Sequence, residues 1–110
     1  MIRYLGPNAR IMMGFTLVIR DEGSAINPHN DNVDVEVTLD HGAKYAATYF
    51  TLQNIHNLME RYTTTGECAN GLYFWSSYIL IVRELTHEAI MSSVADLIES
   101  GDIEYAFERV

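Results

Sequence analysis

The chain has 110 residues, 48% of them apolar, so it can bury one hydrophobic core but not two, and we expect a single domain over residues 1–110. A formal net charge of −8, from 15 acidic against 7 basic residues, disfavours direct binding to nucleic acid or to an anionic membrane. No apolar run approaches the ~20 residues that cross a bilayer, and the first residues lack the features of a signal peptide. With one cysteine no internal disulfide can form, and these features together indicate a cytoplasmic protein.

The first part of the chain predicts one strand followed by a long loop. Residues 12–20 place apolar side chains at every second position, which is the period of a strand with one buried face. Gly14 within this strand indicates a bulge or a close backbone contact. Residues 21–32 are rich in Asp, Asn, Ser, Gly and Pro, and we expect them to form the longest loop.

Residues 33–50 predict a β-hairpin with one apolar face. Residues 33–39 alternate strictly, with valine or leucine at each odd position, and Asp40-His41-Gly42 supplies a turn in which the glycine can adopt a positive φ. The expected register places Val37 opposite Tyr45, so that apolar side chains face apolar ones along both strands. A slip by one residue would turn every valine towards water.

A helix is predicted directly after the hairpin. Thr51 is a suitable N-cap, and Gly66 can end the helix in a left-handed conformation. Apolar residues recur at helical spacing between them: Leu52, Ile55, Leu58, Met59 and Tyr62. We expect this stripe to cover the valine side of the hairpin, with Leu52, Ile55 and Met59 in contact with it.

Three elements are predicted in the remainder of the chain. Residues 72–82 are apolar or aromatic on both faces apart from two serines, which indicates a strand bent or split at the serines. We expect a central strand covered on both sides, or a strand covered on one side and part of an interface on the other. Thr86 and Gly101 are the expected caps of a second helix over residues 87–100. Residues 102–110 alternate, so we predict an edge strand there, with a short helix as the alternative.

The element order is therefore strand, strand, strand, helix, strand, helix, strand. Such an order predicts an α+β fold, with a mainly antiparallel sheet of about five strands and two helices packed on it. The chain contains no repeat, no low-complexity segment and no internal linker.

No pattern in the sequence points to a catalytic or metal site. His56 and Glu60 are four residues apart and could offer two metal ligands, but a third would have to come from elsewhere. The oxygen-rich residues 30–34 do not have the spacing of a calcium loop. Cys68 follows the expected C-terminus of a helix, where the helix dipole does not help to activate a nucleophilic thiol. We therefore predict no cofactor and no metal, and favour a binding protein over an enzyme.

The strongest functional signal is an excess of acids near the C-terminus. From residue 84 to residue 110 there are seven acids against Arg109 alone. A solvated surface would account for them; alternatively, they form an acidic face directed at a basic partner. The residues that we expect in such a face are Glu84, Glu88, Asp96, Glu99 and Asp102.

Aromatic strand residues supply a second signal. Most of them are expected in the core, but Trp75 and Tyr78 have polar tips and lie in the two-sided apolar run. We predict that these two residues anchor a partner.

Three stretches resemble the pattern of a small bacterial family that has no assigned activity. They are Tyr49-Phe50-Thr51-Leu52-Gln53-Asn54-Ile55, Thr65-Gly66-Glu67-Cys68 and Tyr73-Phe74-Trp75-Ser76-Ser77. The resemblance covers roughly residues 33–100 and implies no site residues. In size, acidity and element order the chain is also similar to toxin-immunity proteins and phage-encoded inhibitors.

The leading hypothesis is a small bacterial or phage protein that acts by stoichiometric binding. It would be an immunity protein or inhibitor covering the basic surface of a toxin or nucleic-acid-binding protein. One alternative is a ligand-binding or enzymatic domain with a pocket between sheet and helices, lined by Tyr73, Trp75, His56 or Glu60. Another is a structural homodimer formed through an edge strand such as residues 103–107.

Overall fold

A computed structural model describes residues 14–21 and 23–110 and shows an α+β fold with a mainly antiparallel, five-stranded sheet. The strands are β1 (Phe15–Arg20), β2 (Asn32–Leu39), β3 (Lys44–Phe50), β4 (Ile79–Ile81) and β5 (Glu108–Arg109). The helices are α1 (Leu52–Thr65), α2 (Glu67–Gly71), α3 (His87–Ser100) and α4 (Ile103–Ala106). Strands β1, β2 and β3 pair antiparallel, whereas β4 lies parallel to β3 and β5 antiparallel to it. The two short strands β4 and β5 therefore share one edge of β3.

The hairpin β2–β3 has the predicted register. Val37 pairs with Tyr45 and Val35 with Ala47, and all four residues are buried. The turn between the strands is closed by a backbone hydrogen bond from Gly42, whose φ of 97° is readily available only to glycine. The alternating pattern was sufficient for this prediction because a shifted register would expose the whole valine face.

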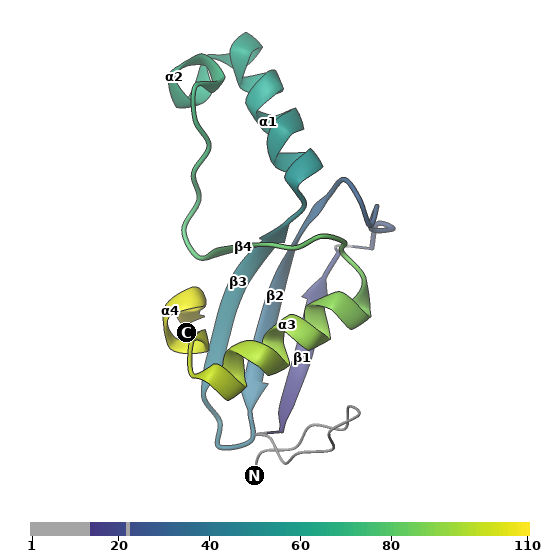
Figure 1. Cartoon of the computed structure of the whole chain (residues 1–110), viewed down its shortest axis with the longest axis vertical. Helices are drawn as coiled ribbons and strands as arrows, with labels where there is room; N and C mark the ends of the chain where they lie inside the picture. Colours follow the sequence, from purple (N-terminus) through teal and green to yellow (C-terminus); the bar gives the residue numbers. More distant parts are fainter. Residues whose placement is uncertain (1–13, 22) are drawn as a thin grey trace.

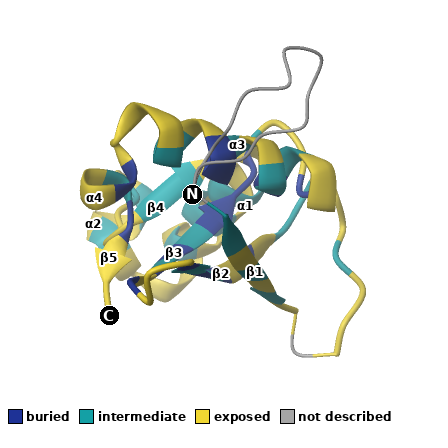
Figure 2. Cartoon of the chain, turned by 90° about the horizontal axis from the view of Figure 1, so that it is seen from below, coloured by how far each residue is buried: buried dark blue, intermediate teal, exposed yellow. Residues whose placement is uncertain are grey.

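The helix that covers the valine face is α3, not α1, so our prediction of the cover is wrong. Ile90 and Val94 of α3 are fully buried and belong to the same cluster as Val35 and Val37. In contrast, α1 has no buried residue and contributes none to that cluster. Figure 2 shows the buried residues where α3 meets the sheet. Leu85, Ile103 and Phe107 complete the cluster and fill the remaining space above the valines.

Helix α1 instead projects beyond the end of the sheet (Figure 1). Together with α2 and the segment that returns to β4, it forms an extension that we call the arm (residues 51–78). The molecule measures 49 Å along its longest axis against 25 and 24 Å across. Its radius of gyration is 15.5 Å, whereas a compact domain of this length has roughly 13 Å. The elongated shape is consistent with a helix that lies outside the main core.

The apolar run over residues 72–82 is not a central strand, which corrects a second prediction. Only Ile79–Ile81 form a strand, β4, and the three residues lie at the sheet edge. The segment before β4 belongs to the arm, where the ring of Phe74 meets that of Phe50 edge-on at 5.1 Å. Its apolar residues are thus divided between the arm and the sheet, which explains why the run is apolar on both faces.

The C-terminal segment is a short helix, α4, followed by the two-residue strand β5. The predicted edge strand over residues 103–107 is therefore wrong, and the alternative of a short helix holds for its first part. The physical reason is that β4 already pairs with Thr48, Tyr49 and Phe50, which leaves only the preceding part of β3 for β5.

Gly14 makes the close contact that its place in the sequence predicted. A Cβ atom there would lie 2.4 Å from a carboxylate oxygen of Asp40, and its carbonyl accepts a hydrogen bond from the Asp40 amide. The first two residues of the predicted strand over 12–20 lie outside the described residues.

Within the described part of the chain, no helix combines the length and the apolar character that a membrane crossing requires.

Candidate partner-binding surface

The acidic residues are positioned by α3, whose two ends are capped as expected. The hydroxyl of Thr86 accepts a hydrogen bond from the Ala89 amide at the start, and Gly101 adopts φ 84° at the end. Glu88, Asp96 and Glu99 then fall within a sector of about 80° on the helix, opposite the buried side.

All five predicted acids are exposed. Glu84 precedes α3 by three residues, and Asp102 follows its last residue by two. We call these residues the acidic face: Glu84, Glu88, Asp96, Glu99 and Asp102. A helix of this length spans about 21 Å, so Glu88, Asp96 and Glu99 lie along one side of α3, with Glu84 and Asp102 in the chain just beyond its two ends.

The two predicted anchor residues are not on α3 but in the segment that returns from the arm to β4. The side chain of Trp75 is 67% exposed and that of Tyr78 is 46% exposed. Tyr78 has φ 50°, a left-handed conformation that is costly for a residue with a side chain, and its carbonyl accepts a hydrogen bond from the Thr48 amide. Acids and aromatic residues thus come from different parts of the fold.

Polar hydrogen bonds hold the base of the arm against the loop before β2. The amide of Asp31 donates to the hydroxyl of Thr51, which also caps α1 by accepting from the Asn54 amide. Asn32 donates to the side chain of Asn54 at 2.8 Å, and Asn57 donates to that of Asn30 at 3.0 Å. The polar side of α1 therefore faces the body of the protein, which directs its apolar side elsewhere.

The tip of the arm is an unusual left-handed turn. Cys68, Ala69 and Asn70 all have positive φ values, between 49° and 61°, followed by Gly71 at 81°. A Cβ atom on Gly71 would lie 2.3 Å from the backbone oxygen of Met59, so only glycine lets the returning chain pack this closely on α1. The arm is thus a helix with a closely packed return segment.

Besides Tyr78, four large apolar side chains of the arm are exposed, and sequence reasoning missed three of them. We call this group the arm patch, with exposed fractions of 69% for Leu52, 79% for Leu72, 49% for Tyr73 and 67% for Trp75. The available signal was the apolar run over 72–75 directly after an Asn-Gly turn. We interpreted that run as a strand, either covered on both sides or with one side in an interface, because periodicity does not distinguish a covered face from an uncovered one.

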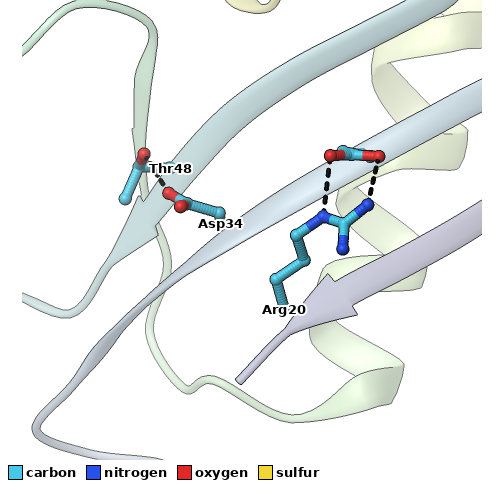
Figure 3. Close-up of polar contacts among 4 residues, drawn as sticks. Arg20, Asp34 and Thr48 are labelled. Carbon is cyan, nitrogen blue, oxygen red and sulfur yellow. Dashed lines mark hydrogen bonds and ion pairs between the residues drawn. The ribbon is translucent and has the colours of Figure 1, made fainter. Parts of the chain in front are cut away.

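The sheet face opposite α3 is polar and carries cross-strand contacts. Arg20 donates two hydrogen bonds to the carboxylate of Glu36, at 2.7 and 3.0 Å, and the hydroxyl of Thr48 donates to Asp34 at 2.8 Å (Figure 3). The Arg20 guanidinium holds the pKa of the Glu36 carboxyl below its usual value. A shallow hollow of about 270 Å³ adjoins these residues and is also lined by Tyr78.

The residues predicted to line a ligand pocket in the alternative hypothesis all lie on the arm. His56 and Glu60 are exposed on α1, and Tyr73 and Trp75 are exposed on the return segment. Between the sheet and α3, where a pocket was the alternative prediction, the described side chains form the hydrophobic core. Among the described residues, no group of three or more His, Cys, Asp or Glu side chains is arranged to hold a metal ion.

Two core tyrosines have raised phenol pKa values. The hydroxyl of Tyr45 donates to the carboxylate of Glu104, and this hydrogen bond raises the phenol pKa above its usual value of 10.0. Burial raises the pKa of Tyr49, whose hydroxyl contacts that of Ser93 on α3. Both contacts join the sheet to the helices that cover it, so they have a structural role.

Comparisons with known protein families, curated proteins and solved structures gave no match. The resemblance of residues 33–100 to a small bacterial family therefore stays a prediction, as does the similarity to immunity proteins and inhibitors.

Proposed function

We propose that the protein acts by stoichiometric binding to a partner protein with a basic surface, as an immunity protein or inhibitor does. The partner would be a toxin or a nucleic-acid-binding protein whose basic surface is needed for its activity. The acidic face would cover that surface, and Trp75 and Tyr78 would anchor the contact.

The observation that carries the proposal is the place of the acids on α3. The buried side of this helix supports the core through Ile90 and Val94, whereas Glu88, Asp96 and Glu99 lie on the opposite side. The acids are therefore not needed to form the core. An exposed stripe of one charge sign attracts an oppositely charged surface and raises the association rate, most strongly at low ionic strength.

The aromatic residues provide the apolar contribution that charge alone does not. Tryptophan and tyrosine are enriched among the residues that dominate binding energy at protein interfaces. Trp75 and Tyr78 are both substantially exposed, so neither would have to leave the core to meet a partner.

The test compares two variants of equal net charge. The first, E84Q/E88Q/D96N/D102N, neutralises four acids of the acidic face. The control, D40N/E60Q/E67Q/E108Q, neutralises four exposed acids in other places. Candidate partners are found by co-expression with proteins encoded beside the gene, and association rates are measured at low and at high salt.

We expect the acidic-face variant to associate at least ~10-fold more slowly at low salt and the control variant to change much less. High salt should reduce the difference, because it screens charge interactions between exposed groups. Equal effects of the two variants would mean that only net charge matters, and the assignment of the acidic face would then be abandoned.

A further inference from the structure

We infer that the arm is the contact through which two copies of this chain bind each other, with the arm patch as its apolar centre. This inference concerns a surface separate from the acidic face. Because Trp75 lies in the arm patch, a dimer would use it between copies and leave Tyr78 as the aromatic anchor for the basic partner.

The arm patch lies on two chain segments that run side by side. Gly71 packs on the backbone of Met59 in the middle of α1, and the ring of Phe74 lies against that of Phe50, at the end of the strand that leads into α1, so the return segment contacts the arm at its tip and its base. Leu52 is in the first turn of that helix. The half-buried side chains between the two segments are already used within the arm, whereas the arm patch points to solvent.

The size of the patch fits a contact between two copies. Large aromatic side chains have areas of about 150–250 Å², so at their exposed fractions the four present at most roughly 400–650 Å², since two of them are the smaller leucine. A symmetric dimer doubles this value to roughly 1,000 Å², which is near the lower limit for a specific interface. On a monomeric protein, an exposed apolar patch of this area would be at the upper end of the usual range of patch areas.

The charge distribution favours a second copy over a basic protein at this place. The arm carries Glu60 and Glu67 against Arg61, a net charge of −1, so −7 of the chain's −8 lies outside it. A basic partner would therefore gain little attraction at the arm. Two copies would repel each other through their bodies, and this repulsion is smallest when they meet at projecting arms of low charge.

The arm is also held in place before binding. Three side-chain hydrogen bonds to residues 30–32 fix the base of α1, through Thr51, Asn54 and Asn57. A contact surface that is already ordered loses less conformational entropy on association than a flexible one.

The experiment uses the full chain alone, with mass measured by light scattering over a wide concentration range. We expect the mass to rise from 12.5 kDa towards twice that value. Trp75 is the only tryptophan, so its fluorescence reports directly on the arm patch. The emission should move to shorter wavelength over the same concentrations, because the indole leaves water when the dimer forms.

The variant Leu72→Ser keeps the fluorophore and removes the most exposed leucine of the patch. We expect it to weaken dimerisation at least ~100-fold, because the substitution occurs on both sides of a symmetric interface. The matched control is Tyr105→Ser, at a side chain on α4 that is 83% exposed and lies outside the arm. The control should dimerise as the unmodified chain does, and circular dichroism verifies that both variants are folded.

A chain that stays monomeric at all concentrations overturns the inference, as does a dimer that Leu72→Ser leaves unchanged. A dimer that forms with no change in Trp75 emission would likewise place the contact elsewhere. Since no basic partner is present, the assay tests the dimer separately from the acidic face; a confirmed dimer would remove only Trp75 from the proposed contact with the basic partner.

Discussion

Helices α1 and α3 allow a matched test of which of them supports the core. Each is preceded by a capping threonine, has 14 residues and carries isoleucine at its fourth position, Ile55 in α1 and Ile90 in α3. Ile90 is 0% exposed and lies in the core cluster, whereas Ile55 is partly exposed and lies outside it. The same substitution to alanine therefore probes two environments with identical chemistry.

We expect Ile90→Ala to lower the free energy of unfolding by about 3–4 kcal/mol, because it leaves a cavity among fully buried neighbours. Ile55→Ala should lower it by only about 1 kcal/mol, since its surroundings are partly open to water. Urea unfolding followed by far-UV circular dichroism measures both values. Equal losses, or a larger loss at Ile55, would show that α1 folds back onto the sheet, and the arm would not exist as described.

Three further changes test the arm and the core contacts. Gly71→Ala should destabilise the arm strongly, since its Cβ would strike the backbone of α1, whereas Gly42→Ala has free space and should lower stability by only about 1–2 kcal/mol from its positive φ; urea midpoints of the two variants compare them. Thr51→Ala should lower stability by about 1–2 kcal/mol through the lost cap, and should increase amide hydrogen exchange in the first turn of α1 rather than in α3. The raised pKa values of Tyr45 and Tyr49 mean that the unfolded chain loses phenol protons first above a pH of about 10, so the free energy of unfolding should be unaffected below that pH and fall as the pH rises further. Tyr49→Phe should reduce this alkaline fall, and a urea midpoint that stays constant between pH 8 and pH 11 would contradict the assignment.

Short-range sequence patterns predicted the hairpin and the helix caps, because these depend on residues that are close together in the sequence. The hairpin register followed from strict alternation, and the caps Thr51, Gly66, Thr86 and Gly101 followed from residue type and position. The outward direction of the acids on α3 also followed from helical period. That part of the candidate site could therefore be predicted from the sequence, because it depends only on the geometry of one helix.

The arm patch could not be predicted in this way. Leu72 and Tyr73 have the composition of a buried strand, and nothing in their order indicates that the chain would carry them away from the sheet. Their exposure depends on where α1 points; hydrogen bonds between Asn30 and Asn57 and between Asn32 and Asn54 help to hold it there. These pairs are more than 20 residues apart in the sequence, so no local pattern reveals them.

The amino-acid sequence by itself determined the strands of the hairpin, their register and the limits of both long helices. It did not determine which helix would cover the valines, since α1 and α3 have equal length, similar caps and similar apolar spacing. Only the tertiary structure decided this, because the space above Val35 and Val37 holds one helix together with Leu85, Ile103 and Phe107. Once α3 occupies that space, α1 is left outside the core, with the apolar side chains of its arm exposed to solvent.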